Sequence, residues 1–266
     1  MAIPLSPSRA SDFKSCPQLF KYRAVDQLPE PADPAGTRGS LVHSALQELF
    51  KLPPKQRVPQ VVPELLSRGW ENLCSEVEGD QLELSSPPGT LGLNDQELDQ
   101  VMSESNSMME RYFLIEDPRK VRALNLEWWV EHHSEKTSLR GIIDRVDVTP
   151  EGAWILTDYK TGRSPSESYA LGSFFGLKFY ALVCWRTYGK MPKALRLLHL
   201  KEPEEIKLIP SEAMLEATEK QMSALGIAIA RAYKTDDWRA RPSKLCSWCP
   251  HRSICPAWKS EMATAV

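Results

Sequence analysis

The chain has 266 residues, of which 42% are hydrophobic and 26% are charged, and its formal net charge is −2. These values suit one large globular domain, or one domain with an appended lobe. No apolar run is long enough to cross a bilayer, and the first residues lack the basic start and apolar core of a signal peptide. We therefore expect a cytoplasmic protein without membrane partners, whose six cysteines are free thiols or metal ligands and not disulfides.

The charges are distributed unevenly along the chain. Twelve acidic residues and one basic residue lie between Glu71 and Asp117, so the rest of the chain has a net positive charge. A segregated positive surface could hold a phosphate backbone, with the acidic segment turned away from it. Two solvated helix faces would explain the acidic segment equally well, so charge alone leaves nucleic-acid binding open.

The N-terminal part of the chain predicts helices. Residues 8–22 read as a short helix interrupted near Pro17, in which Cys16 looks locally like a buried thiol. A proline-rich linker follows, and residues 37–51 then form an amphipathic helix with His43 near its N-terminal end. Taken alone, a single helical histidine is more often a hydrogen-bonded core residue than a metal ligand.

Two further helices and a strand are predicted before the middle of the chain. The helices cover residues 61–78 and 94–116, and a loop rich in glycine, proline and serine separates them. The strand covers residues 121–133, where alternation places Glu127 on the face opposite the apolar residues. Those apolar residues are Leu124, Leu126, Trp128 and Val130. An exposed strand glutamate is as good an interpretation of Glu127 as a functional one.

A β-hairpin pattern follows at residues 139–161, where two apolar runs flank a turn signal at residues 149–152. Asp144 and Asp158 stand on these strands where apolar residues are expected. Lys160 follows Asp158 by two positions, so both side chains point to the same face. Two carboxylates and an ammonium group on paired strands make a site for a hard divalent cation and a polarised water. A surface ion pair is the alternative.

Two motifs in this hairpin resemble the PD-(D/E)XK nuclease superfamily. They are G-x-x-D-R-x-D at residues 141–147 and D-Y-K-T-G at residues 158–162, and together they are most similar to the RecB-like exonuclease branch. The resemblance implies an α/β (α+β) fold, with a restriction-endonuclease-like mixed central sheet flanked by helices. It also implies an N-terminal helical region at 1–120, a nuclease core at 121–235 and a C-terminal iron–sulfur knuckle at 236–266, packed as one globular unit.

The resemblance also assigns roles to individual residues. The pattern R-G-x-x-x-H ends at His43, which reverses the interpretation of that histidine as a core residue. The expected ligands of Mg²⁺ or Mn²⁺ are His43, Asp144, Asp158 and the backbone carbonyl of Tyr159. The expected catalytic residues are Lys160, Asp158, Asp144, Glu127 and Tyr180.

The chain departs from the family pattern at one position. The helix predicted over residues 169–188 carries Tyr180 of the motif Q-x-x-x-Y, but Gly176 stands where the glutamine is expected. That departure puts substrate positioning in doubt and leaves the metal site intact. Lys178 is a candidate to take over part of the role, and Arg38, Arg145 and Lys178 are the expected DNA contacts. A strand at 194–200 and a helix at 211–233 complete an αβββαβ core.

The C-terminal segment contains a cysteine motif. Cys246 and Cys249 form a C-x-x-C pair, Cys255 follows, and the fourth ligand of a metal site would be His251 or a distant cysteine. Spacing alone favours zinc. Some RecB-like nucleases, however, hold a [4Fe–4S] cluster with one cysteine upstream of the core and three near the C-terminus. That resemblance selects Cys16 as the fourth ligand and makes zinc the less favoured occupant.

These observations predict a metal-dependent DNA nuclease, an exonuclease on single-stranded or end-frayed DNA in repair or recombination. Basic residues interleaved with Trp238 and Trp248 suit single-stranded nucleic acid. No Walker-type phosphate loop is present, so a helicase partner would be another chain. The alternatives are a DNA-binding subunit with a weakened or lost nuclease site and, more remotely, a zinc-knuckle interaction protein.

Overall fold

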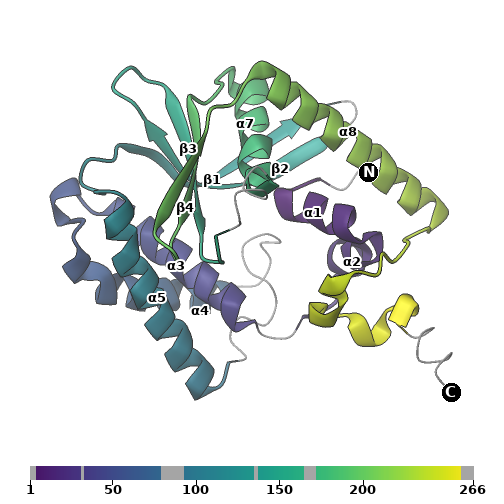
Figure 1. The fold of residues 1–266 in the computed structure, drawn as a ribbon, viewed down its shortest axis with the longest axis horizontal. Coiled ribbons are helices and arrows are strands. Elements are labelled where there is room, and N and C mark those ends of the chain that lie inside the picture. Colours follow the sequence, from purple (N-terminus) through teal and green to yellow (C-terminus); the bar gives the residue numbers. More distant parts are fainter. Residues whose placement is uncertain (1–3, 31–32, 79–92, 135–136, 165–171, 259–266) are drawn as a thin grey trace.

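The computed structural model describes residues 4–30, 33–78, 93–134, 137–164 and 172–258, and it centres on a five-stranded mixed sheet (Figure 1). The strand order is β1-β2-β3-β4-β5. Strands β3 and β4 pair in parallel, and the other neighbours pair antiparallel. The strands are β1 (Ala123–His133), β2 (Ser138–Val148), β3 (Trp154–Lys160), β4 (Ala194–His199) and β5 (Glu204–Leu208).

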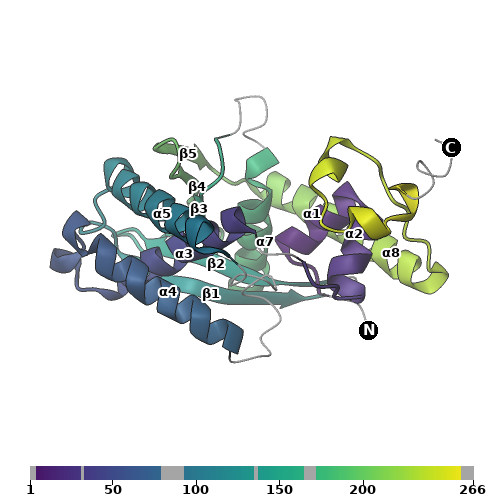
Figure 2. The ribbon, with the colours of Figure 1, turned by 90° about the horizontal axis from the view of Figure 1, so that it is seen from below.

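Helices cover both faces of the sheet and create two hydrophobic cores (Figures 1 and 2). One core holds residues of α1, α7 and α8, and the other holds residues of α3, α4 and α5. The helices are α1 (Pro7–Ser15), α2 (Pro17–Phe20), α3 (Pro34–Lys51), α4 (Val62–Glu78), α5 (Asp95–Ile115), α7 (Phe175–Tyr188) and α8 (Glu212–Thr235). No helix in the described part of the chain has the length and apolar character needed to span a membrane.

Local sequence signals explain where the long helices begin. The side chain of Asp33 accepts hydrogen bonds from two backbone amides in the first turn of α3. Asn94 and Glu97 form a reciprocal capping box at the start of α5, and the Ser211 hydroxyl caps α8. Such side chains satisfy amide groups that the first helical turn leaves without partners. The caps therefore determine where these helices begin. His43 lies on α3, so the cap at Asp33 helps to determine where that histidine is placed.

The predicted fold class is confirmed, and most predicted elements lie within a few residues of the observed ones. The predicted helix at 169–188 begins at Phe175, and residues 165–171 lie outside the described part of the chain. Most of the predicted loop at 79–93 also lies outside it. Strand β5 was not predicted, because its charged sequence EEIKL is short and contains only two apolar residues, Ile206 and Leu208.

The prediction of one continuous apolar face on β1 is wrong. Leu126 packs in the core beneath α3 and α5, whereas Trp128 and Val130 belong to the core beneath α7. Between them, Glu127 has a φ angle of +41°, in the left-handed region that side chains disfavour by about 1–2 kcal/mol. This reversal changes the side to which the strand presents its residues. Backbone strain of this kind concentrates at functional sites.

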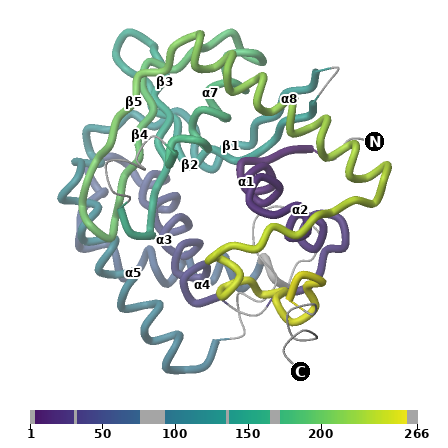
Figure 3. The backbone as a smooth tube through the Cα atoms, turned by 45° about the vertical axis from the view of Figure 1, so that its right-hand side comes forward, coloured from purple at the N-terminus to yellow at the C-terminus, as the bar shows by residue number. Residues whose placement is uncertain are grey.

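Helices α1 and α2, near the start of the chain, lie beside the last described segment of the chain (Figure 3). Near the N-terminus, the Leu5 amide donates to Ser138 O at 2.8 Å, and the Arg140 amide donates to Leu5 O at 2.8 Å. The C-terminal turns at 244–254 then pack near α1 and α2, which brings Cys16 close to the cysteines of the last described segment.

Candidate active site

Three side chains from three elements converge above the sheet. His43 on α3, Glu127 on β1 and Asp144 on β2 offer ligand atoms that all lie within 4.8 Å of one another. Two carboxylates and an imidazole match the ligands preferred by Mg²⁺ and Mn²⁺. The residues therefore fit a divalent cation. Glu127 joins the group because its left-handed backbone turns its side chain to this side of the sheet.

The backbone of Tyr159 on β3 connects two of these side chains. Its amide donates a hydrogen bond to Asp144 Oδ2 at 2.8 Å, and its carbonyl oxygen lies 3.1 Å from His43 Nε2. His43 Nδ1 lies 3.5 Å from Asp144 Oδ2. A single residue's backbone thus fixes the orientation of a carboxylate and an imidazole, and it places its own carbonyl beside the candidate metal group.

The pKa values of these groups reflect burial and mutual repulsion. Burial raises the pKa of Asp144, the neighbouring Asp158 raises it further, and His43 acts in the opposite direction. Burial lowers the pKa of His43, but Asp144, Glu127 and Asp158 outweigh it, so the net pKa is raised. The carboxylates around His43 together carry more negative charge than the imidazole can neutralise. A divalent cation bound among them would compensate that charge.

Asp158 and Lys160 form a pair next to this group. Lys160 Nζ lies 2.6 Å from Asp158 Oδ2, and Asp158 stands outside the three-residue group although it was expected among the ligands. Burial lowers the pKa of Lys160, but Asp158 outweighs burial and the pKa is raised. Lys160 is therefore an ammonium group that can donate hydrogen bonds or stabilise negative charge, and it is not a base.

Tyr180 on α7 packs directly against the backbone of Gly141 on β2. A β-carbon at Gly141 would lie 2.7 Å from Tyr180 Cε1 and 3.0 Å from its hydroxyl oxygen. Real atoms do not approach so closely, so only glycine allows the tyrosine ring to lie there. Burial raises the pKa of Tyr180, which keeps its phenol neutral. The glycine of the G-x-x-D-R-x-D motif thus makes room for a residue of the site.

We expect Gly141→Ala to displace the Tyr180 ring and to lower turnover at this site by about tenfold or more, which corresponds to about 1.4 kcal/mol of lost transition-state stabilisation. The matched control is Gly172→Ala, because a β-carbon at Gly172 meets no atom within 4 Å. Single-turnover cleavage by both variants measures the effect. A Gly141→Ala protein as active as the control would show that the position of Tyr180 is unimportant.

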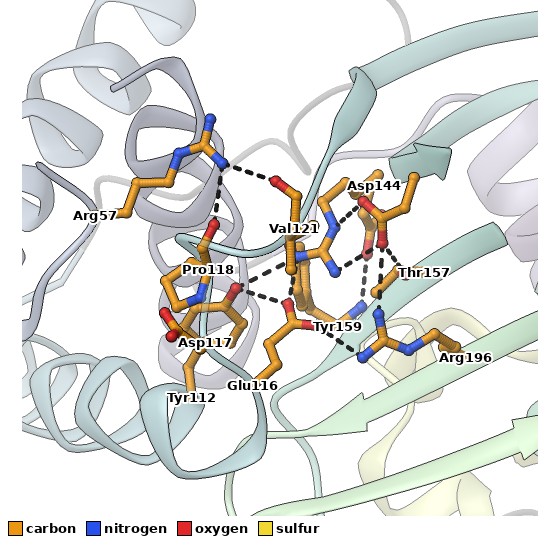
Figure 4. Close-up of polar contacts among 12 residues, drawn as sticks. Arg57, Tyr112, Glu116, Asp117, Pro118, Val121, Asp144, Thr157, Tyr159 and Arg196 are labelled. Carbon is orange, nitrogen blue, oxygen red and sulfur yellow. Dashed lines mark hydrogen bonds and ion pairs between the residues drawn. The ribbon is translucent and has the colours of Figure 1, made fainter. Parts of the chain in front are cut away.

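Arg145, which the motif led us to expect as a DNA contact, lies inside the protein. Its side chain is completely buried, and its guanidinium group lies 2.7 Å from Asp147 and 2.7 Å from Glu116. Glu116 also binds Arg196 on β4 at 2.7 Å, and Figure 4 shows this part of the network. A side chain sealed from solvent by two carboxylates cannot reach a substrate.

The buried network reaches the active site through Tyr159. Arg145 Nη1 donates to the Tyr159 hydroxyl at 2.6 Å, and the ring of Tyr159 packs edge-on against His43 with centroids 5.7 Å apart. The backbone of the same tyrosine contacts Asp144 and His43. Arg145 therefore supports the site from within the core beneath α3 and α5, where it also contacts Phe50 and Tyr112.

The other two predicted DNA contacts have different environments. Arg38 forms an ion pair with Glu104 of α5, and its side chain is 15% exposed. Lys178 is half-buried on α7, and burial lowers its pKa. At Gly176, the position of the expected glutamine, an added β-carbon would have only Pro7 near it, at 3.8 Å. A glutamine side chain would therefore have room there.

The predicted iron–sulfur ligands surround one cavity. Cys16, Cys246, Cys249 and Cys255 all line a cavity of about 460 Å³ between α1, α2 and the C-terminal turns. No three of these sulfur atoms lie within 4.8 Å of one another. Tetrahedral zinc with Zn–S bonds of about 2.3 Å requires sulfur atoms about 3.8 Å apart. As the four cysteines are placed in this structure, no three of them could therefore bind one tetrahedral zinc ion.

His251, the alternative zinc ligand, instead contacts Glu30. It is 4% exposed, and its Nε2 lies 3.0 Å from Glu30 Oε1. The sulfur atoms instead receive backbone donors: the Arg241 amide lies 3.4 Å from Cys16 Sγ, and the Ser243 amide lies 3.3 Å from Cys246 Sγ. Amide hydrogen bonds to sulfur tune and stabilise bound iron–sulfur clusters. The donor set therefore fits a cluster.

Only one of the two tryptophans in the basic C-terminal segment is available for stacking. Trp238 is 7% exposed and stacks on Phe20 with centroids 6.0 Å apart, so its ring is part of the core. Trp248 is 84% exposed. The aromatic and basic character of the segment thus arises partly from core packing.

Comparison with known proteins identifies a family. The model of the PD-(D/E)XK nuclease superfamily matches residues 4–256. A crystal structure of a candidate exonuclease from Eubacterium rectale matches with a TM-score of 0.58 and 10% identity, covering 97% of this chain and 88% of that chain. The structure of SSO0001 matches with a TM-score of 0.40 and 13% identity, covering 93% and 84%. Comparison with curated proteins gave no match.

Proposed function

Since the chain belongs to the PD-(D/E)XK nuclease superfamily, we propose that it is a Mg²⁺- or Mn²⁺-dependent DNA nuclease of the RecB-like type. We further propose that it acts as an exonuclease on single-stranded or end-frayed DNA. One observation carries the proposal: His43, Glu127 and Asp144 converge beside the ion pair of Asp158 and Lys160. An acidic metal group beside a cation is the arrangement that phosphodiester hydrolysis requires.

The residues have distinct roles in this proposal. His43, Glu127 and Asp144 would hold the cation, with the Tyr159 carbonyl and Asp158 as further ligands. The bound cation would polarise the scissile phosphate and lower the pKa of a water. The Lys160 ammonium group orients the attacking water and stabilises negative charge on the phosphate, because its raised pKa keeps it protonated. The Tyr180 hydroxyl, which burial keeps neutral, would donate a hydrogen bond to the substrate.

The test is digestion of end-labelled single-stranded DNA by the purified protein, with Mn²⁺ or with a chelator. The proposal predicts cleavage that depends on the metal. Immediate release of the labelled nucleotide, or stepwise shortening, would identify an exonuclease, whereas scattered internal fragments would identify an endonuclease. DNA that stays intact with Mn²⁺ and with Mg²⁺ would overturn the proposal.

Gly176 supports a second candidate, a DNA-binding subunit whose cleavage is weak. The family pattern has a glutamine here, and a glycine has no side chain with which to contact the substrate. Because a β-carbon added at Gly176 would have only Pro7 near it, Gly176→Gln is sterically possible. A large gain in cleavage by Gly176→Gln, starting from a nearly inactive protein that binds DNA, would favour this candidate.

We also propose that Cys16, Cys246, Cys249 and Cys255 hold a [4Fe–4S] cluster. Burial and the other three sulfur atoms raise the pKa of Cys249, and a cationic group bound among the four cysteines would offset that effect. The cluster would join the first helices to the last turns of the chain. Such a link closes a very long loop and lowers the entropy of the unfolded chain.

We expect Cys246→Ser to lose iron, sulfide and visible absorption, and to unfold at a lower temperature than the parent protein. The matched control is Cys74→Ser on α4, since Cys74 does not line the cavity. Anaerobic purification, iron and sulfide analysis, and thermal unfolding followed by circular dichroism measure these effects. A colourless parent protein with one equivalent of zinc would contradict the cluster and favour the zinc site.

A further inference from the structure

A second cavity, of about 310 Å³, adjoins the metal group between α3 and α4. It is lined by Gly39, Ser40, His43, Ser44, Gln47, Leu73 and Glu127. His43 and Glu127 belong to the candidate metal group as well. One ligand could therefore occupy this cavity and reach the candidate metal group at the same time.

One face of α3 supplies the polar wall of the cavity. Ser40, Ser44 and Gln47 follow one another at spacings of four and three residues, which aligns them on the same side of the helix. All three are half-buried. Among the described residues, their side chains make no hydrogen bond to one another or to any other group. Water can solvate these half-buried groups, and a polar ligand that enters the cavity can replace that water with hydrogen bonds of its own.

Charge decides which part of a DNA strand fits this cavity. The lining contains the carboxylate of Glu127 but no lysine or arginine. The carboxylate of Glu127 would repel a phosphate, and the imidazole of His43 already faces Asp144 at 3.5 Å, whereas a sugar and a base are neutral. Leu73, only 4% exposed, offers an apolar wall for a base. Ligand pockets begin at about 300 Å³, so the cavity has room for one nucleoside and not for a base pair.

We propose that this cavity binds the base and sugar of one unpaired nucleotide adjoining the scissile phosphate. The inference rests on the proposed nuclease function and specifies its substrate. The Gln47 amide reads a base edge, as amide side chains do elsewhere, and the hydroxyls of Ser40 and Ser44 bind the sugar. Leu73 packs against the base. Duplex ends must therefore fray before cleavage.

The test compares Gln47→Leu and Ser44→Ala with the parent protein on short single strands, in which an abasic residue replaces each nucleotide in turn. We expect Gln47→Leu to raise KM about fivefold, the worth of one hydrogen bond, with kcat changed by less than about twofold. The parent should bind and cleave worst when the abasic residue adjoins the cleaved bond, and Gln47→Leu should reduce that penalty. Fluorescence anisotropy of labelled strands, without added metal, measures binding separately from cleavage.

The matched control is Glu48→Gln, because Glu48 follows Gln47 on α3 but pairs with Lys51 and does not line the cavity. If Gln47→Leu and Ser44→Ala keep the parent's KM, affinity and abasic penalty, the inference is overturned. Equal cleavage of fully paired blunt ends and single strands would overturn it too. If no DNA is cleaved but the abasic penalty on binding depends on Gln47, the nuclease proposal fails and the nucleotide site stands.

Discussion

Asp158→Asn is expected to lower kcat on single-stranded DNA by about a thousandfold or more, equivalent to about 4 kcal/mol of transition-state stabilisation. The substitution keeps the shape of the side chain and removes the charge that holds Lys160 Nζ at 2.6 Å. Lys160 would then lose its orientation toward the phosphate, and the metal group would lose a neighbouring carboxylate. Both changes affect the same chemical step.

Stability should hardly change in Asp158→Asn. The Lys160 side chain is 40% exposed, so water can solvate its charge when the partner is gone, and pairs of this kind contribute at most about 1 kcal/mol. The control is Asp237→Asn, which removes the carboxylate of an exposed pair with Arg239. Single-turnover cleavage and thermal unfolding are the measurements. More than about a tenth of the parent's rate in Asp158→Asn would exclude an essential role for this carboxylate in catalysis.

The hairpin motifs made much of the site predictable from sequence. Acidic residues in otherwise apolar strands are costly to bury and are therefore candidates for a functional role, and the structure places Asp144 and Asp158 near His43. Strand periodicity correctly places Lys160 beside Asp158, because β3 is regular over its whole length. The helix boundaries were also predictable, since residues such as Asn94 and Glu97 signal them directly.

The long-range contacts of the site and the reversal of the backbone in β1 could not be predicted from the sequence. Arg145 was expected to contact DNA, and nothing near it in the sequence reveals that its partner Glu116 comes from a different part of the chain. The change of side on β1 occurs at Glu127, and no glycine marks that positive φ angle. Strand β5 is an edge strand rich in charge, which protects a sheet edge but hides the strand's periodicity. The nucleotide cavity depends on how α4 packs against α3.

Arg145→Met is expected to destabilise the protein by about 3–5 kcal/mol, the cost of breaking a buried ion pair from one side. Arg145 is completely buried and binds Asp147 and Glu116, both at 2.7 Å. Methionine fills similar space and leaves both carboxylates without this cation. Urea unfolding at neutral pH measures the loss. The control is Arg68→Met, which breaks an exposed pair with Glu64 and should cost less than about 1 kcal/mol.

The pH dependence distinguishes this electrostatic cause from a packing defect. Burial raises the pKa of Glu116, but the opposite effect of Arg145 and Arg196 is larger. The pKa of Glu116 is therefore about 2 in the folded protein, whereas a glutamate in an unfolded chain has a pKa of about 4. That stabilisation is present above pH 4 and is lost as the pH falls toward 2. In Arg145→Met the uncompensated carboxylates have raised pKa values, so protonation favours the folded state. The stability difference between parent and variant should therefore narrow on acidification, whereas a packing defect would keep it constant.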